Sequence, residues 1–240
     1  MTITSPHNEH LKSVRKLNQR RRERERAGRF VAEGEDLLAA ADAAGWQPLE
    51  RYCAAGSGLL GTEVEPRVLA AVSELGSGTR TLAVYAERWA PAPAGPLCVY
   101  LHGVQDPGNV GTILRSAEAF GAASVAIGPG TADPFGPKAV RASMGSVFAV
   151  PVARAESPGA AELAALPGRS VALAADADTP LHQLALDGEL TLLIGAERTG
   201  LPGEIVAVAD HVARIPIATH SLNAAMAATV ALYEASRMAR

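Results

Sequence analysis

The sequence predicts an α/β protein with a mostly parallel sheet, divided into two domains. Strand-like apolar runs alternate with helix-like segments along most of the 240 residues, which is typical of βαβ units. The run LTLLIG at 190–195 is almost wholly apolar, as expected of a strand buried on both faces of a parallel sheet. A proline-rich stretch interrupts the alternation and predicts a linker at 91–96, between an N-terminal domain (1–90) and a C-terminal domain (97–240).

The N-terminal domain is predicted to open with a basic helix, because Leu11, Val14 and Leu17 recur at roughly helical spacing. RFVAEG then has the character of a strand, and EDLLAAADAAG that of a helix ending at a glycine. Three further segments continue the alternation as strand, helix and strand: LERYCAAG (49–56), PRVLAAVSEL (66–75) and TLAVYAE (81–87).

The C-terminal domain continues the same alternation. Strands are predicted at 96–104, 124–128, 148–153, 170–175, 190–195 and 211–217. Helices are predicted at 109–120, 137–146, 159–166, 204–209 and 221–237. Asn109 and Ser221 are favoured N-cap residue types for the helices that they precede, and Gly111 permits the close approach of another backbone.

Composition restricts the function classes. With 48% hydrophobic but only 4% aromatic residues, the core is expected to consist mainly of Ala, Val and Leu. Cys53 and Cys98 are far apart, so we expect reduced, buried thiols, and no His or Cys spacing predicts a metal site. The N-terminus has no apolar signal-like region and no run reaches the length of a membrane span, so we expect a cytoplasmic protein.

The net charge of −3 conceals a basic block between His10 and Arg29, where nine basic residues face two acidic ones. Such a block can bind a phosphate backbone. It can equally be a solvated helix whose arginines pair with Glu23 and Glu25. Charge alone leaves both interpretations open.

Three short segments carry polar side chains that packing does not require: 109–122, 192–202 and 213–227. Their candidate functional residues are Asn109, Arg115, Glu197, Ser221 and Asn223. Because ligands bind at the carboxyl ends of parallel strands, these segments predict one shared pocket. Taken singly, they also fit helix caps, a tight turn at Gly195–Gly200 and an ion pair between Arg115 and Glu118. The phosphate-binding fingerprints of dinucleotide and triphosphate enzymes are missing, which disfavours a generic nucleotide-dependent enzyme.

Taken in order, the motifs resemble the SpoU (TrmH) family of RNA 2′-O-ribose methyltransferases. They are Asn-x-Gly-x-x-x-Arg from Asn109, Gly-x-Glu-x-x-Gly from Gly195, and Ile-Pro followed by Ser-Leu-Asn from Ile215. The segment 138–145 (KAVRASMG) is also similar to that family, and the resemblance covers 96–240. The first ninety residues more loosely resemble the family's ribosomal-protein-like substrate-binding domain, notably in RFVAEGEDLL.

The resemblance implies a deep trefoil knot, bound S-adenosylmethionine, and a homodimer in which each site takes groups from the partner. By the same resemblance, Gly195, Ile215 and Leu222 would hold the cofactor, and the five candidate residues would form the reacting centre. A guanidinium cannot accept a proton, so we expect Arg115 to position a phosphate and stabilise the developing alkoxide while another group takes the proton.

The RNA is expected to be ribosomal, with transfer RNA as an alternative; a non-catalytic RNA-binding or ribosome-assembly protein of the same fold is the other alternative. The expected RNA contacts are all basic: Lys12, Arg15, Lys16, Arg20, Arg21, Arg22, Arg29, Lys138 and Arg141.

Overall fold

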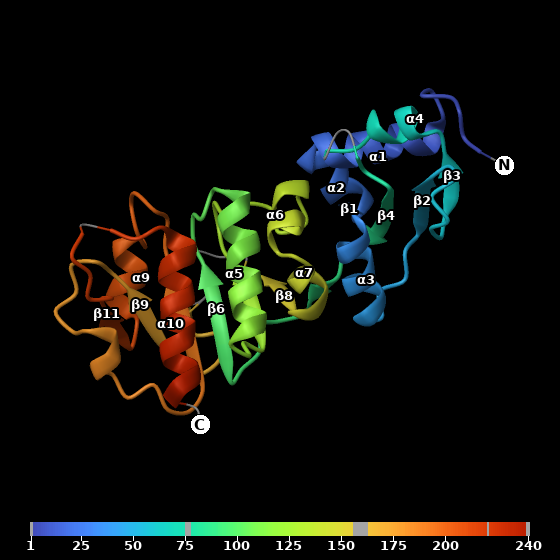
Figure 1. Cartoon of the computed structure of the whole chain (residues 1–240). Helices are drawn as coiled ribbons and strands as arrows, with labels where there is room; N and C mark the ends of the chain where they lie inside the picture. The colour runs from blue at the N-terminus through green and yellow to red at the C-terminus, as the bar shows by residue number, and fades with distance from the viewer. Residues whose placement is uncertain (1, 75–77, 156–162, 220, 239–240) are drawn as a thin grey trace.

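The computed structural model describes residues 2–74, 78–155, 163–219 and 221–238, and contains two sheets (Figure 1). The smaller sheet has the strand order β1-β4-β2-β3. Its strands are β1 (Arg29–Glu33), β2 (Glu50–Ala54), β3 (Thr62–Val64) and β4 (Thr81–Ala86). β4 is antiparallel to both of its neighbours, and β3 is parallel to β2.

The helices of this part are α1 (Glu9–Gln19), α2 (Arg21–Ala27), α3 (Glu35–Ala43) and α4 (Pro66–Ala70). The predicted apolar face of α1 is confirmed, because Leu11, Val14 and Leu17 are buried. The basic segment is nevertheless two helices, since Arg20 adopts an extended backbone (φ −130°, ψ 111°) between them. This break lets α2 turn away from α1 toward the second sheet (Figure 1).

The larger sheet has seven strands in the order β11-β9-β10-β6-β7-β8-β5, and every neighbouring pair is parallel. The strands are β5 (Trp89–Ala90), β6 (Leu97–Leu101), β7 (Ser124–Ile127), β8 (Val152–Arg154), β9 (Arg169–Leu173), β10 (Leu190–Ile194) and β11 (His211–Ala213). The predicted α/β class is confirmed. β10 lies between β6 and β9 with all of its residues buried, as its apolar sequence predicts.

The helices beside this sheet are α5 (Pro107–Ala119), α6 (Pro137–Ala142), α7 (Ser146–Ala149), α9 (Gly203–Val208) and α10 (Ala224–Met238), with a 3₁₀ turn at Leu181–Gln183. α5 and α10 pack side by side, joined by a 2.7 Å hydrogen bond between Ser116 Oγ and Thr229 Oγ1 (Figure 1). α6 crosses α5 at Gly111, where a Cβ would lie 2.3 Å from the carbonyl oxygen of Ala139. Gly111 therefore permits the close backbone approach that the sequence predicts.

One predicted strand differs from the structure, and one predicted helix lies partly outside the described residues. The strand predicted at 148–153 is wrong in its first half, because α7 continues to Ala149 and β8 begins only at Val152. The helical turn buries Val147 and Phe148 together, whereas a strand would point consecutive side chains to opposite faces. The first half of the helix predicted at 159–166 lies outside the described residues, which resume at 163.

Aromatic packing joins the two sheets. Phe30 and Trp46 from the first part of the chain contact Phe148 from the second, with ring centroids 5.9 and 5.2 Å apart. Trp46 Nε1 also donates a 2.9 Å hydrogen bond to the Phe148 carbonyl oxygen. One hydrophobic cluster therefore runs through both parts. In addition, β5, which the sequence places in the first domain, pairs with β8 of the larger sheet.

Both cysteines are free and buried, as expected. Within the described ranges, no helix combines the length and apolar character needed to cross a membrane.

Candidate active site

Two loops at the carboxyl edge of the larger sheet enclose a cavity of about 660 Å³. One loop follows β10 and contains Gly195–Gly200; the other follows β11 and contains Ile215 and Leu222. The volume lies within the range of small-molecule pockets. Apolar side chains form most of the wall: Leu173, Ile194, Leu201, Val206, Ile215, Ile217 and Leu222.

The loop after β10 folds back on itself through two backbone hydrogen bonds between Ala196 and Gly200, of 2.9 and 3.1 Å. A Cβ at Gly195 would lie 2.2 Å from the carbonyl carbon of Gly200, so this position requires glycine. Gly200 has a positive φ of 66°. The tight turn at Gly195–Gly200 therefore also forms part of the cavity wall.

A chain of hydrogen bonds joins the three predicted segments. Asn223 Nδ2 donates to Asn109 Oδ1 over 3.1 Å, and Asn109 Nδ2 donates to Glu197 Oε1. The three residues come from the start of α10, the first turn of α5 and the loop after β10. Ser221, Gly195, Ile215 and Leu222 line the adjoining cavity together with Glu197.

Both predicted helix caps are wrong. Asp106 caps α5 by accepting a 2.6 Å hydrogen bond from the Gly108 amide, so Asn109 lies within the first turn. Asn223 caps α10 by accepting from the amides of Ala225 and Met226, at 3.0 and 3.3 Å. Because Asp106 performs the capping, the Asn109 side chain is available to the network.

Lys138 Nζ lies 3.0 Å from Asp106 Oδ2, beside this helix start. Its hydrogen bond, helped by the Gly108 amide, lowers the pKa of Asp106 despite partial desolvation. The Asp106 carboxylate is thus held ionised where it caps α5.

Arg115 is not brought into this network. It is exposed on the outer face of α5 and does not line the cavity. Over the described residues, Arg115 has no ion pair or hydrogen bond, so the alternative pairing with Glu118 is not formed. Six residues separate it from Asn109, which places the two side chains on different faces of the helix.

Asp176 and Arg198 also line the cavity, and sequence analysis did not single them out. Asp176 follows β9 and Arg198 follows β10, so a search for polar residues after every predicted strand would have found both. Among the residues that the structure describes, no group of three or more His, Cys, Asp or Glu side chains is placed to hold a metal ion.

The cations of the basic block differ in their partners. Arg21 and Arg26 pair with Glu25 and Glu23 one helical turn away, at 2.8 and 2.7 Å, which is the helical pairing considered as the alternative. Lys12 pairs in the same way with Glu9, at 2.7 Å. Arg24 is buried and pairs with Asp133 of the second domain. The other exposed cations of the block form no ion pair within the described part of the chain: Lys16, Arg20, Arg22 and Arg29. The same is true of Arg141 on α6, another predicted RNA contact. Arg15 donates a long 3.5 Å hydrogen bond to the Ala71 carbonyl oxygen.

A parallel sheet with a ligand-sized pocket and a polar network at its strand ends defines a ligand-binding α/β protein. Residues 96–233 match the SpoU rRNA Methylase family, and residues 8–84 match the MRM3-like substrate binding domain. The chain belongs to the SpoU rRNA methylase family, which confirms the resemblance carried by the three motifs.

Solved structures agree with this assignment. An AdoMet-bound rRNA methyltransferase from Sinorhizobium meliloti has a TM-score of 0.86 and 32% identity, over 99% of this chain and 97% of that one. The SpoU methyltransferase AviRb from Streptomyces viridochromogenes, in complex with AdoMet, has a TM-score of 0.85 and 30% identity, over 98% of this chain and 100% of that one.

Among named sequences, a 23S rRNA (uridine(2479)-2′-O)-methyltransferase of Streptomyces viridochromogenes is 39% identical over 140 residues. That alignment covers 55% of this chain and 49% of the relative, so the chain spans about half the length of this curated relative.

Proposed function

We propose that this protein transfers a methyl group from S-adenosylmethionine to a ribose 2′-hydroxyl of RNA, and that the RNA is ribosomal. The observation that carries the proposal is the Asn109–Glu197–Asn223 network at the edge of a ligand-sized cavity. Family membership and the AdoMet-bound relatives support it.

The cavity suits this cofactor by shape and by charge. Its apolar wall, including Ile215 and Leu222, can enclose the adenine ring, and the loop at Gly195 offers backbone groups close to a ligand. Its charged lining residues are two carboxylates, Asp176 and Glu197, and one cation, Arg198. This balance favours a sulfonium compound over a phosphorylated nucleotide. When bound, the cofactor supplies an electrophilic methyl group.

The protein's own residues orient the acceptor. Asn109, held by Glu197 and Asn223, presents a fixed amide beside the cavity, and Ser221 adds a hydroxyl on the opposite loop. Fixed dipoles of this kind stabilise charge that develops on the ribose oxygen during transfer. A guanidinium cannot accept a proton, so the role of Arg115 is to bind a phosphate and to stabilise the alkoxide.

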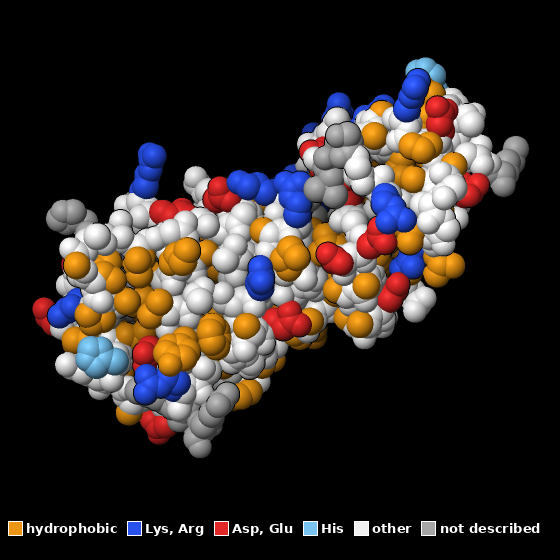
Figure 2. All heavy atoms as spheres, in the orientation of Figure 1, with side chains coloured by type: hydrophobic (Ala, Val, Ile, Leu, Met, Phe, Trp, Pro, Cys, Tyr) orange, Lys and Arg blue, Asp and Glu red, His pale blue; other side chains and the backbone are white. Residues whose placement is uncertain are grey.

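A homodimer would bring Arg115 of one protomer close to the hydrogen-bonded network of Asn109, Glu197 and Asn223 in its partner. On the outer face of α10, Met226, Val230 and Tyr233 are 62%, 38% and 47% exposed. Their spacing puts them on one stripe, and orange side chains gather over α10 in Figure 2. α5, which carries Arg115, packs directly beside α10. A second copy of the chain docked on this apolar face would cover the stripe and place Arg115 near the partner's network.

We further propose the division of labour and the knot that the family resemblance implies. Residues 1–90 bind RNA through the expected cations, 91–96 connect the domains, and 97–240 carry the reaction, with the C-terminal segment threaded as a trefoil knot. The unpaired cations of the basic block support the RNA-binding role. We place the protein in the cytoplasm, where ribosomal RNA is available.

The direct test incubates the purified protein and radiolabelled S-adenosylmethionine with ribosomal RNA or with transfer RNA. We expect label in ribosomal RNA, at a ribose that mass spectrometry identifies. Label confined to transfer RNA would overturn the ribosomal assignment. Failure to bind S-adenosylmethionine in calorimetry at millimolar concentration would instead indicate a non-catalytic RNA-binding protein.

A further inference from the structure

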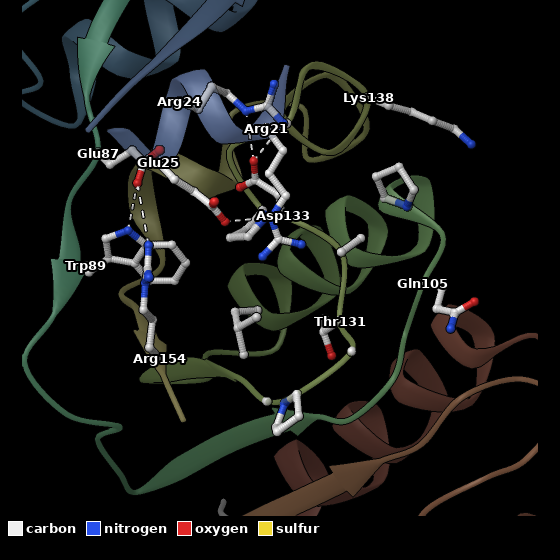
Figure 3. Close-up of a pocket in the computed structure, with 18 of the residues that line it drawn as sticks. Arg21, Arg24, Glu25, Glu87, Trp89, Gln105, Thr131, Asp133, Lys138 and Arg154 are labelled. Carbon is white, nitrogen blue, oxygen red and sulfur yellow. Dashed lines mark hydrogen bonds and ion pairs between the residues drawn. The ribbon is translucent and has the colours of Figure 1, made fainter. Parts of the chain in front are cut away.

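A second cavity, of about 690 Å³, lies between the two domains and has no assigned role (Figure 3). Its walls come from α2, from the segment that follows β7, and from β5 and the end of β8. Gln105 and Pro107, at the entry to α5, complete the wall. The cavity therefore reaches the helix start on which Asn109 sits, two residues beyond Pro107.

The cavity contains a stacked pair of planar groups. The Arg154 guanidinium carbon lies 4.1 Å from the centroid of the Trp89 ring, and Figure 3 shows the guanidinium over that ring. Phe135 packs edge-on against Trp89, with centroids 5.1 Å apart. The Arg154 side chain is 48% exposed. It covers one face of the indole and leaves its own outer face open.

Glu87 fixes the orientation of this pair. Its side chain is only 6% exposed and accepts a 2.9 Å hydrogen bond from Trp89 Nε1. Its Oε2 lies 3.9 Å from Arg154 Nη2, which is within ion-pair range but beyond hydrogen-bond distance. Arg154 donates no hydrogen bond to any other residue in the described ranges. Its donors and its outer face are both available to a ligand.

Two exposed cations stand at the rim of the cavity: Arg21 on α2 and Lys138 on α6. Each is engaged in a surface pair, with Glu25 at 2.8 Å and with Asp106 at 3.0 Å. Surface pairs of this kind contribute little stability, so a phosphate can take the place of Glu25 beside Arg21 or of Asp106 beside Lys138. Arg24 and Asp133 also line the cavity but neutralise each other in a buried pair.

We propose that this cavity, the Trp89–Arg154 cleft, binds an unpaired nucleotide that flanks the methylated one. This inference rests on the proposed RNA methyltransferase function. The base stacks on the outer face of the Arg154 guanidinium, and the neighbouring phosphates approach Arg21 and Lys138. Guanidinium planes stack on bases in single-stranded RNA, and such stacking tolerates any base because every base has a π face. The cleft thus recognises a splayed-out strand without reading its sequence.

The test compares Arg154→Lys with Arg169→Lys in the full-length protein. Lysine keeps the charge but cannot stack as a plane. Arg169 is a fair control because its side chain is similarly exposed, at 43%, and it lies at the start of β9, away from the cleft. The probe is a labelled single-stranded RNA oligomer about ten nucleotides long, which is long enough to fill such a site.

We expect Arg154→Lys to weaken binding of this oligomer about tenfold, as loss of one base stack does, while Arg169→Lys leaves it unchanged. A hairpin duplex of the same sequence and S-adenosylmethionine should bind both variants like the unaltered protein. Trp89→Leu should reproduce the defect, because the guanidinium then loses its support.

Unchanged oligomer binding in Arg154→Lys would overturn the cleft assignment, even if the protein methylates RNA normally. The reverse outcome is distinguishable: oligomer binding that depends on Arg154 in a protein that methylates no RNA would support the cleft and contradict the proposed function. If the unaltered protein does not bind the oligomer, the cleft assignment also fails.

Discussion

Asn223 donates a 3.1 Å hydrogen bond to Asn109, across 114 residues of sequence, and thereby ties the start of α10 to the first turn of α5. The same Asn223 side chain caps α10 through its oxygen. The side-chain oxygen of Asn223 therefore caps α10, and its side-chain nitrogen orients Asn109.

Asn223→Asp should separate these two roles. The aspartate keeps the cap but loses the donor and places a negative charge beside the network, so methylation should fall at least about tenfold while stability changes little. Asn8→Ala is the matched control, because Asn8 caps α1 in the same way and should lower stability by about 1 kcal/mol without loss of turnover. Urea unfolding and initial rates measure both. Normal turnover in Asn223→Asp would show that the donor is dispensable.

Mixing two inactive variants tests whether Arg115 acts in the partner's site. Arg115→Ala and Asn109→Ala should each abolish methylation as homodimers. If each site combines Asn109 of one protomer with Arg115 of the other, co-refolded mixtures regain activity through one intact site per heterodimer. Mixtures that stay inactive, although mass analysis shows heterodimers, would place Arg115 in its own protomer's site.

The buried pair between Arg24 and Asp133 should hold the two domains together. Its side chains are only 7% and 12% exposed, so Arg24→Ala leaves a buried carboxylate unpaired and should lower the free energy of unfolding by about 3–5 kcal/mol. Removing both partners should be less damaging, since no charge is stranded. Arg26→Ala, in an exposed pair with Glu23, should change stability by less than about 1 kcal/mol. Equal losses for Arg24→Ala and Arg26→Ala would contradict this view.

Gly111→Ala should destabilise the protein although alanine is the better helix former by about 1 kcal/mol. The new Cβ would meet the Ala139 carbonyl oxygen at 2.3 Å, a backbone atom that cannot move without shifting α6. Gly203→Ala, at the start of α9, meets nothing within 4 Å and should be tolerated. Thermal unfolding of the two variants provides the comparison. A higher unfolding temperature for Gly111→Ala would mean that α6 can shift to accommodate the new Cβ.

Glu87 should give stability a dependence on pH. Burial raises its pKa above the ordinary value of 4.5, with the Trp89 N–H opposing the shift. The folded state therefore binds this proton more tightly than the unfolded chain does, and stability falls as pH rises from about the ordinary value through the raised one. Glu87→Gln removes this dependence. Because glutamine resembles the protonated carboxyl group, the urea midpoints of the two proteins should be similar at low pH, and the unaltered protein should become the less stable one as the pH rises. A difference that stays constant across that pH range would contradict the shift.

Local sequence correctly predicted most of the elements that position the site. The apolar run of β10 and the helical spacing of Leu11, Val14 and Leu17 each predicted the observed structure, because both patterns follow from which faces are buried. Helix starts were less predictable. Asp106, Asn109, Ser221 and Asn223 are all suitable cap types, so only the folded backbone selects which of them caps.

The sequence by itself determined the α/β class, the family, and the three segments that the hydrogen bonds among Asn109, Glu197 and Asn223 join, because these depend on patterns that neighbouring residues define. Only the tertiary structure decided that Arg24 stabilises the domain junction while Arg20 and Arg22 stay exposed, and that Arg115 stands apart from Asn109. Only the tertiary structure shows that Trp89 and Arg154 meet in a cleft. These relationships depend on which distant segments meet, and charge or side-chain type carries no information about the partner that packing will supply.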